Sequence, residues 1–263
     1  LKLTKAPSDF FSALLPFPSN WDALNFVLET ALIGNELDPR TLEFIDSGAL
    51  EIMRTAEGFP DIPSDIKALL YVKQEYENDD EKDRFLQMWF EKTITASRRE
   101  FEDFIFVTQT FKEKENFRLW RHRIPEAANE HGRDYWNAGG GKIGTDWWVP
   151  LQNLREMMEY FYKISDTTGL PYMGYAHIGS GHPHTNYLAK NPEEKKRAND
   201  ALILCCKKAV ELGGGVAGEH GIGKLHTDLL PIQYSKSVIE KMKKWKLEYD
   251  PNWILGKGNI FKL

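Results

Sequence analysis

Cysteine is nearly absent from the sequence, which has only two among its 263 residues, the adjacent Cys205 and Cys206. A disulfide framework or a zinc ribbon needs spaced cysteine pairs, so this arrangement excludes both and fits a reducing compartment. Long apolar runs are absent as well. None reaches the roughly 18 residues of a membrane-spanning helix, and the first residues have no signal-peptide pattern. We therefore expect a cytoplasmic protein, with peripheral attachment to a membrane left open.

An excess of positive charge is also lacking. The chain has 34 Lys and Arg residues against 39 Asp and Glu residues, a formal net charge of -5, and its basic residues are scattered. This balance argues against nucleic acid as a partner. With 41% hydrophobic and 28% charged residues, the composition is that of an ordered globular protein. The chain opens with LKLTKAP and no initiator Met, so a trimmed or excised fragment is one hypothesis.

Segments with a 3.6-residue apolar period alternate with short β-rich runs, and no internal repeat is visible. We expect helices at 20–34, 48–56, 80–99, 115–130, 152–166, 193–212 and 236–248, and strands at 41–46, 68–76, 104–109, 172–178 and from residue 184 onward. Asp79 and Asp80 are the expected caps of the long charged helix. Many strands are half polar, unlike those of a buried parallel sheet. The pattern predicts an α+β fold, a mostly antiparallel sheet with helices on one face.

The stretch YAHIGSGHPHTNYLAK, residues 175–190, contains three histidines within eight residues. His177 and His184 are seven apart, a spacing that would place them on opposite faces of one continuous strand. Turn-forming glycines, a serine and a proline lie between them, so the chain can reverse and bring both rings together. The period of two then carries Asn186 to the same face as His184. The pattern predicts a His, His, Asn cluster.

Two imidazoles hold a divalent transition metal poorly without a third ligand, typically a carboxylate. Glu219 and His220 lie in GGGVAGEHGIGK, residues 213–224, where glycines let backbone or a ligand approach closely. Such a neighbouring pair can supply one metal ligand and one general base. On its own, the histidine stretch can be a solvated turn or a site of core histidines, and the glycine-rich stretch a weak phosphate loop. Together they favour a metal site.

These segments belong to an ordered series of motifs: TLEFIDSGALEIM at 41–53, LWRHRIPEA at 119–127, AHIGSGHPHTN at 176–186, GGGVAGEHGIGKLHTDLLP at 213–231 and DPNWILGKGNIF at 250–261. The series resembles the C-terminal part of the FAD-linked oxidase family, which includes glycolate oxidase, D-lactate dehydrogenase and D-2-hydroxyglutarate dehydrogenase. The resemblance implies a ferredoxin-like cap of a vanillyl-alcohol-oxidase-type flavoenzyme. Residues 1–263 would form this substrate-binding domain, with the N-terminal FAD-binding domain absent from the chain.

The resemblance also implies roles for individual residues. A divalent metal, with zinc favoured over iron or manganese, would be bound by His177, His184 and Glu219. His220 would accept the proton of the substrate hydroxyl. Arg123, three residues after the helix Trp, would hold the substrate carboxylate, a role that suits the planar fork of a guanidinium.

Further roles fall on Asn186, which would orient the substrate or a ligand, and on Gly221 and Asn259, which would lie near the flavin. The chain departs from the family pattern at several positions. Ser180 replaces the usual acidic residue of the histidine turn. His182 replaces a polar residue and is either an added metal ligand or a turn residue without a role in the site.

The implied function is oxidation of a 2-hydroxy acid of the lactate, glycolate or 2-hydroxyglutarate type to the 2-oxo acid, with FAD as hydride acceptor. The expected partners are an FAD-binding domain in the same polypeptide or in a separate subunit, the hydroxy acid and an electron acceptor, and a homodimer is left open. Without the flavin domain we expect no turnover. Two alternatives remain: a stand-alone metal-dependent hydrolase or lyase, and a degenerate cap that acts as an interaction module.

Overall fold

A seven-stranded sheet forms the centre of the protein. The structure is a computed structural model that describes residues 6–32, 37–55 and 57–261. The strands lie in the order β4–β1–β3–β2–β6–β7–β5, and every neighbouring pair is antiparallel. Their bounds are β1 Asp9–Phe17, β2 Thr41–Ile45, β3 Ala68–Tyr76, β4 Phe106–Val107, β5 Gly141–Gly144, β6 Tyr172–His177 and β7 His182–Ala189. The predicted α+β class with an antiparallel sheet is confirmed.

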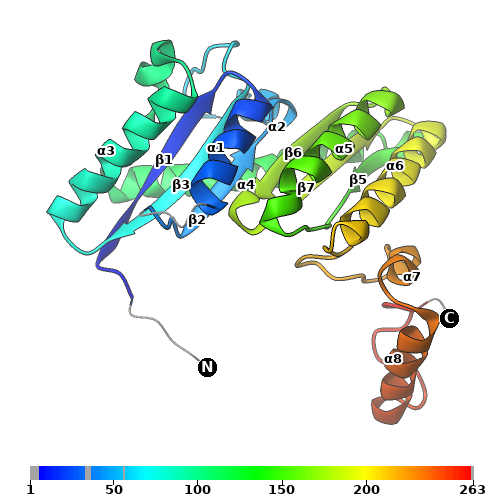
Figure 1. Ribbon diagram of the computed structural model, residues 1–263. Coiled ribbons are helices and arrows are strands. Elements are labelled where there is room, and N and C mark those ends of the chain that lie inside the picture. The colour runs from blue at the N-terminus through cyan, green and yellow to red at the C-terminus, as the bar shows by residue number, and fades with distance from the viewer. Residues whose placement is uncertain (1–5, 33–36, 56, 262–263) are drawn as a thin grey trace.

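Helices cover both faces of this sheet rather than one (Figure 1). The larger hydrophobic core lies under four of them, α1 (Asn20–Leu32), α3 (Asp79–Ala96), α5 (Leu154–Thr168) and α6 (Pro192–Glu211). A second core lies on the opposite face under α2 (Ser47–Met53) and α4 (Phe111–Asp134). The expectation of one covered face is thus corrected. Consecutive residues of β3 point to alternate faces, and Ala68 through Val72 are all buried, so both faces need a cover.

The order of elements repeats within the chain. A strand, a helix, two strands and a helix occur first as β1, α1, β2, β3 and α3, and again as β5, α5, β6, β7 and α6. In both halves the third strand lies between the first and the second, and β4 completes the first half as a ferredoxin-like unit. The sequence shows no repeat because only topology is shared. For example, α2 and a loop join β2 to β3, whereas a turn at 178–181 joins β6 to β7.

The sequence-based expectation lacks the strands β1 and β5 and places the cap of α3 at other residues. β1 contains Pro16, which cannot donate to a ladder, but β4 pairs with β1 only at Ala13 and Leu14, so the proline is tolerated. β5 is only four residues long and has glycine at both ends, so in the sequence it resembles a loop rather than a strand. The cap of α3 is Asn78, whose side chain accepts the Glu81 N–H at 2.9 Å, rather than either predicted aspartate.

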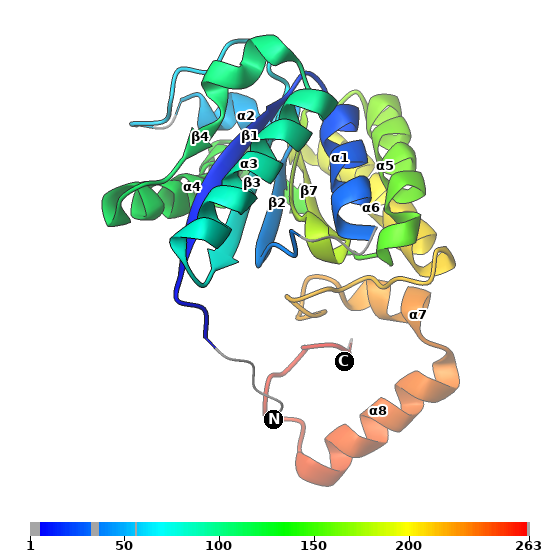
Figure 2. The ribbon, with the colours of Figure 1, turned by 60° about the vertical axis from the view of Figure 1, so that its left-hand side comes forward.

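Beyond α6 the chain leaves the sheet (Figure 2). A glycine-rich loop leads to the short helix α7 (Leu230–Gln233) and then to α8 (Lys236–Tyr249), none of whose residues is buried. Large apolar side chains of this region, among them Trp245, Tyr249 and Ile254, are exposed. In the part of the chain that the structure describes, no helix has the length and apolar character needed to cross a membrane.

The two halves of the sheet join where β2 meets β6. Only two residue pairs form this seam, Phe44 with Ala176 and Ile45 with Tyr175. Directly after it, Asp46 caps α2, and its Oδ1 accepts the Ala49 N–H at 2.9 Å. Its other oxygen, Oδ2, is buried without a hydrogen-bond partner among the described residues. Burial raises the pKa of Asp46 to about 7.

We predict that D46N alters the pH dependence of stability. The pKa of Asp46 rises from 3.8 to about 7 on folding, so its favourable contribution is full below pH 4 and is lost as the pH rises through 7. Asn keeps the capping oxygen but does not titrate. The difference in unfolding free energy, variant minus parent, should therefore increase by about 4 kcal/mol between pH 4 and pH 8. Urea unfolding across this range measures it, and a constant difference would contradict the assignment.

Candidate functional site

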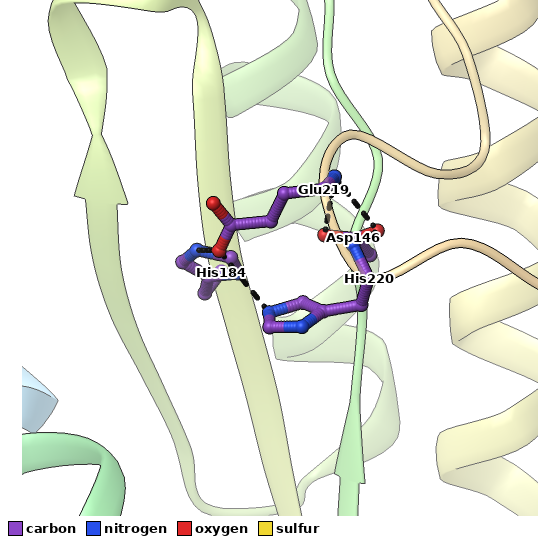
Figure 3. A group of neighbouring side chains, drawn as sticks. All are labelled: Asp146, His184, Glu219 and His220. Carbon is purple, nitrogen blue, oxygen red and sulfur yellow. Dashed lines mark hydrogen bonds and ion pairs between the residues drawn. The ribbon is translucent and has the colours of Figure 1, made fainter.

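Segments that are distant in sequence meet beside β6 and β7 (Figure 3). His177 ends β6 and His184 lies in β7, and the turn between these strands reverses the chain as the sequence predicts. The loop that follows α6 supplies Glu219 and His220, whose side chains extend toward β7. The structure therefore brings together the four residues predicted to bind the metal and to accept the proton.

The carboxylate of Glu219 lies among three imidazoles. Its Oε1 is 3.2 Å from Nε2 of His184 and 3.2 Å from Nε2 of His220, and its Oε2 is 3.6 Å from Nε2 of His177. Two ligands of a tetrahedral zinc ion, each about 2.1 Å from it, are about 3.4 Å apart. The two distances from Oε1 of Glu219 are close to this separation, and imidazoles with a carboxylate suit a small divalent cation. Among the described residues, His177 is not in the group whose ligand atoms all lie within 4.8 Å of one another.

Glu43 orients His177 from the other half of the sheet. The seam pairs Phe44 with Ala176, so the antiparallel register sets Glu43 beside His177. Nδ1 of His177 donates to Oε1 of Glu43 at 2.9 Å, and Arg121 of α4 reaches the same oxygen at 2.8 Å. The hydrogen bond with Glu43 raises the pKa of His177. It also leaves Nε2 facing Glu219, an arrangement typical of metal-binding histidines.

His184 has a different environment. Its side chain is 8% exposed, and its ring centroid is 4.6 Å from that of His182 and 5.3 Å from that of Tyr175. Burial, with a further contribution from His182, lowers the pKa of His184 to about 4. Its imidazole is therefore neutral at pH 7, which is the form that binds a metal.

Asp146, which sequence reasoning assigned no role, completes the cluster. One ligand atom from each of Asp146, His184, Glu219 and His220 lies within 4.8 Å of the others. Asp146 is buried and accepts hydrogen bonds from the ring of His182 and from the backbone of the loop that carries Glu219. Burial raises its pKa, but the hydrogen bonds from His182 and from the His220 N–H outweigh this and lower it. The one feature of the sequence that could have pointed to Asp146 is its position in the segment TDWWVP, directly after β5.

A cavity of about 310 Å³ adjoins the cluster. His177, His184, Glu219 and His220 line it, and so do Arg121, Lys142 and Tyr175. Desolvation lowers the pKa of Lys142, and no ion pair engages its ammonium group within the described residues. The cavity thus joins the cluster of histidines and Glu219 to cationic side chains, which suits a small anionic ligand.

Arg123 lies outside this cavity. It is exposed on α4 and pairs with Glu130 at 2.9 Å and with Glu126 at 3.9 Å. Arg121, two residues earlier, faces the cavity instead. Successive helix residues are about 100° apart, so residues two positions apart point to nearly opposite sides. Of these two arginines, Arg121 is therefore the one whose side chain lines the cavity.

The remaining predicted residues do not line the cavity. Asn186 is buried next to the cluster, and its Nδ2 donates to the His184 carbonyl at 3.3 Å. Gly221 directly follows His220 and has a positive φ of 67°, which favours glycine. Asn259 is exposed in the C-terminal segment, and the neighbouring Ile260 N–H donates to the Gly223 carbonyl at 2.8 Å. The proposed flavin contacts of Gly221 and Asn259 stay predictions.

Comparison with known proteins confirms the resemblance. The family described as FAD linked oxidases, C-terminal domain, matches residues 6–260. The chain is 27% identical over 232 residues to the glycolate oxidase subunit GlcD of Bacillus subtilis (strain 168), which covers 88% of this chain and 47% of that protein. It is 26% identical over 267 residues to the D-lactate dehydrogenase of Archaeoglobus fulgidus, covering 100% of this chain and 54% of the relative. The chain thus spans about half the length of these relatives.

Solved structures show the same fold. A 4-ethylphenol oxidase from Gulosibacter chungangensis in complex with isoeugenol matches with a TM-score of 0.62 and 16% identity, over 99% of this chain and 55% of that one. A p-cresol methylhydroxylase with substrate bound matches with a TM-score of 0.61 and 14% identity, over 97% and 53%. At these identities the likeness concerns the fold alone. It confirms the expected fold and shows that these two enzymes share it.

We predict that E43Q lowers the pKa of His177 in the metal-free chain. The hydrogen bond with Glu43 is the main cause of the raised pKa, and burial, which lowers it, remains in the variant. NMR titration of the ring protons measures the change. E130Q removes an exposed carboxylate near Arg123 and serves as the control. An unchanged His177 titration in E43Q would show that Glu43 does not set its protonation.

Proposed function

The chain belongs to the family of FAD-linked oxidase C-terminal domains, and on this premise we propose that it forms the substrate-binding half of a flavoenzyme that oxidises a 2-hydroxy acid to the 2-oxo acid. The observation that supports this most is the position of Glu219 between His177 and His184, at the edge of a cavity that Arg121 also lines. The names of the relatives, a glycolate oxidase subunit and a D-lactate dehydrogenase, agree with a small hydroxy acid as substrate.

His177, His184 and Glu219 would hold a divalent metal, with zinc favoured over iron or manganese. When bound, such an ion lowers the pKa of a hydroxyl oxygen through Lewis-acid polarisation. The residues fit this purpose because one histidine is neutral through burial and the other is oriented by Glu43. The exposed side of the cluster leaves room for substrate oxygens, as a catalytic site needs.

His220 would accept the hydroxyl proton. Its side chain is 68% exposed, so the ring can pass the proton on to solvent. Nε2 of His220 lies 3.2 Å from Oε1 of Glu219, and this carboxylate would stabilise the imidazolium that forms.

Arg121 would hold the substrate carboxylate in place of Arg123. Only one of its terminal nitrogens is engaged by Glu43, so the guanidinium keeps other donors for a planar carboxylate. Lys142 adds a second positive charge to the cavity wall. Together these groups favour an anionic substrate over a neutral alcohol.

FAD would be bound mainly outside this chain, by a domain in the same polypeptide or in a separate subunit. When bound, the flavin supplies the hydride acceptor, which these side chains cannot provide. The chain would orient the hydroxy acid so that its hydrogen-bearing carbon faces that domain. An electron acceptor would then reoxidise the flavin, and the isolated chain would not turn over.

We predict that the purified chain, stripped with EDTA, binds about one equivalent of zinc and that E219A weakens this binding at least about tenfold. E211A removes a solvent-exposed carboxylate and should leave the affinity unchanged. Calorimetry and elemental analysis give affinity and stoichiometry. Equal zinc affinity of E219A and the parent would contradict the assignment of Glu219 as a metal ligand. Hydrolysis of simple esters by the zinc-loaded chain without flavin would favour the hydrolase alternative.

A second prediction separates the two arginines in the enzyme assembled with its flavin domain. R121A should raise KM for the hydroxy acid about 100-fold, because a charge-assisted pair with the carboxylate is lost. R123A removes an exposed ion pair on the same helix and should change KM less than about threefold. Steady-state kinetics of both variants decides, and a larger effect of R123A would return the role to Arg123.

A further inference from the structure

The loop that carries Glu219 and His220 lies against the segment that follows β5. Trp148 and Gly215 exchange two backbone hydrogen bonds of 3.0 Å, and the Gly218 N–H reaches the Asp146 carbonyl at 2.6 Å. On its other side this segment is bound to β7 and its turn, since the Val149 N–H donates to the Gly181 carbonyl at 2.9 Å. Residues 145–149 thus connect the histidine strands to the loop.

The side chain of Asp146 adds a denser set of contacts. Its Oδ2 accepts the backbone N–H groups of three successive residues, Gly218 at 3.0 Å, Glu219 at 3.2 Å and His220 at 2.9 Å. Its Oδ1 accepts from Nε2 of His182 at 2.9 Å, and both side chains are buried. These contacts engage both oxygens of the carboxylate, although the Gly218 N–H is shared with the Asp146 carbonyl. Asp146 is therefore better placed as an anchor than as a metal ligand.

The loop also packs directly on the ring of His182. A Cβ atom on Gly218 would lie 2.4 Å from Nε2 of His182, so only glycine fits there. Glycines are frequent in this loop, and each adds conformational freedom that must be lost when the site forms. Three N–H groups held by one carboxylate remove much of that freedom at the residues that carry the functional side chains.

We propose that Asp146 and His182 are positioning residues: His182 fixes the Asp146 carboxylate, which fixes the loop backbone so that Glu219 and His220 extend toward His184. Neither touches the substrate, and both act through the loop. Figure 3 shows Asp146 beside the loop backbone, with both functional side chains directed toward β7. The part of this inference that concerns metal affinity rests on the proposed function, whereas the anchoring of the loop does not.

The first test needs no metal. Hydrogen exchange of the Glu219 and His220 amides, measured by NMR on the stripped chain, should accelerate at least about tenfold in D146N, because the uncharged amide oxygen of Asn accepts these hydrogen bonds more weakly than a carboxylate does. H182L should also accelerate it, whereas H182Q, whose Nε2 replaces that of the imidazole as a donor toward Asp146, should retain most of the protection. If D146N does not fold, the H182L and H182Q pair decides. Equal exchange in H182L, H182Q and the parent would overturn the proposal.

The second test measures zinc affinity. D146N and H182L should bind zinc about 10- to 100-fold more weakly, as expected for residues that orient metal ligands, and H182Q should restore most of the affinity. S165A is the matched control, since it removes another buried hydrogen bond of the same half, the 2.7 Å contact with Tyr187. An equal loss in S165A would reduce the effect to general destabilisation and refute the positioning role. If exchange responds but the parent binds no zinc, the anchoring stands and the proposed metal function fails.

Discussion

The register of the β2–β6 seam is the constraint on which the site depends. Only two residue pairs join the halves of the sheet there, yet they set Glu43 of one half beside His177 of the other. The first half thereby supplies the carboxylate that orients a histidine of the second. A shift of one residue would turn the Glu43 side chain to the opposite face of the sheet and remove this support.

Two carboxylates divide the task of holding the cluster. Glu43 holds His177 from the sheet, and Asp146 holds the glycine-rich loop from the segment after β5. Glu219 lies between them with its carboxylate among the imidazoles. Because the two supporting carboxylates are buried and engaged by donors of their own, Glu219 is the acidic group that stays available, 46% exposed, for a cation or a substrate.

Sequence reasoning anticipated the convergence of His177, His184 and Glu219 because turn residues and glycines permit only a few chain paths. It did not anticipate that Arg121 rather than Arg123 lines the cavity, since the rotation of α4 is set by packing of Ile124, Ala127 and Ala128 against the sheet. Local sequence does not reveal that packing. The anchoring by Asp146 was equally hidden, because it joins a side chain to backbone groups more than seventy residues away. β5 was missed because four residues give too short a pattern.

The sheet ends on both sides in its shortest strands, β4 with two residues and β5 with four. Edge strands expose unpaired backbone groups that can recruit a strand from another molecule. At the β5 edge such a molecule would find few groups to pair with, and α4 packs beside β5. At the other edge, β4 pairs with β1 only at Ala13 and Leu14, so the rest of the outer side of β1 has no strand partner among the described residues. The strands β2, β6 and β7 that carry the site are all interior. A strand added at either edge would therefore leave the register of these strands unchanged.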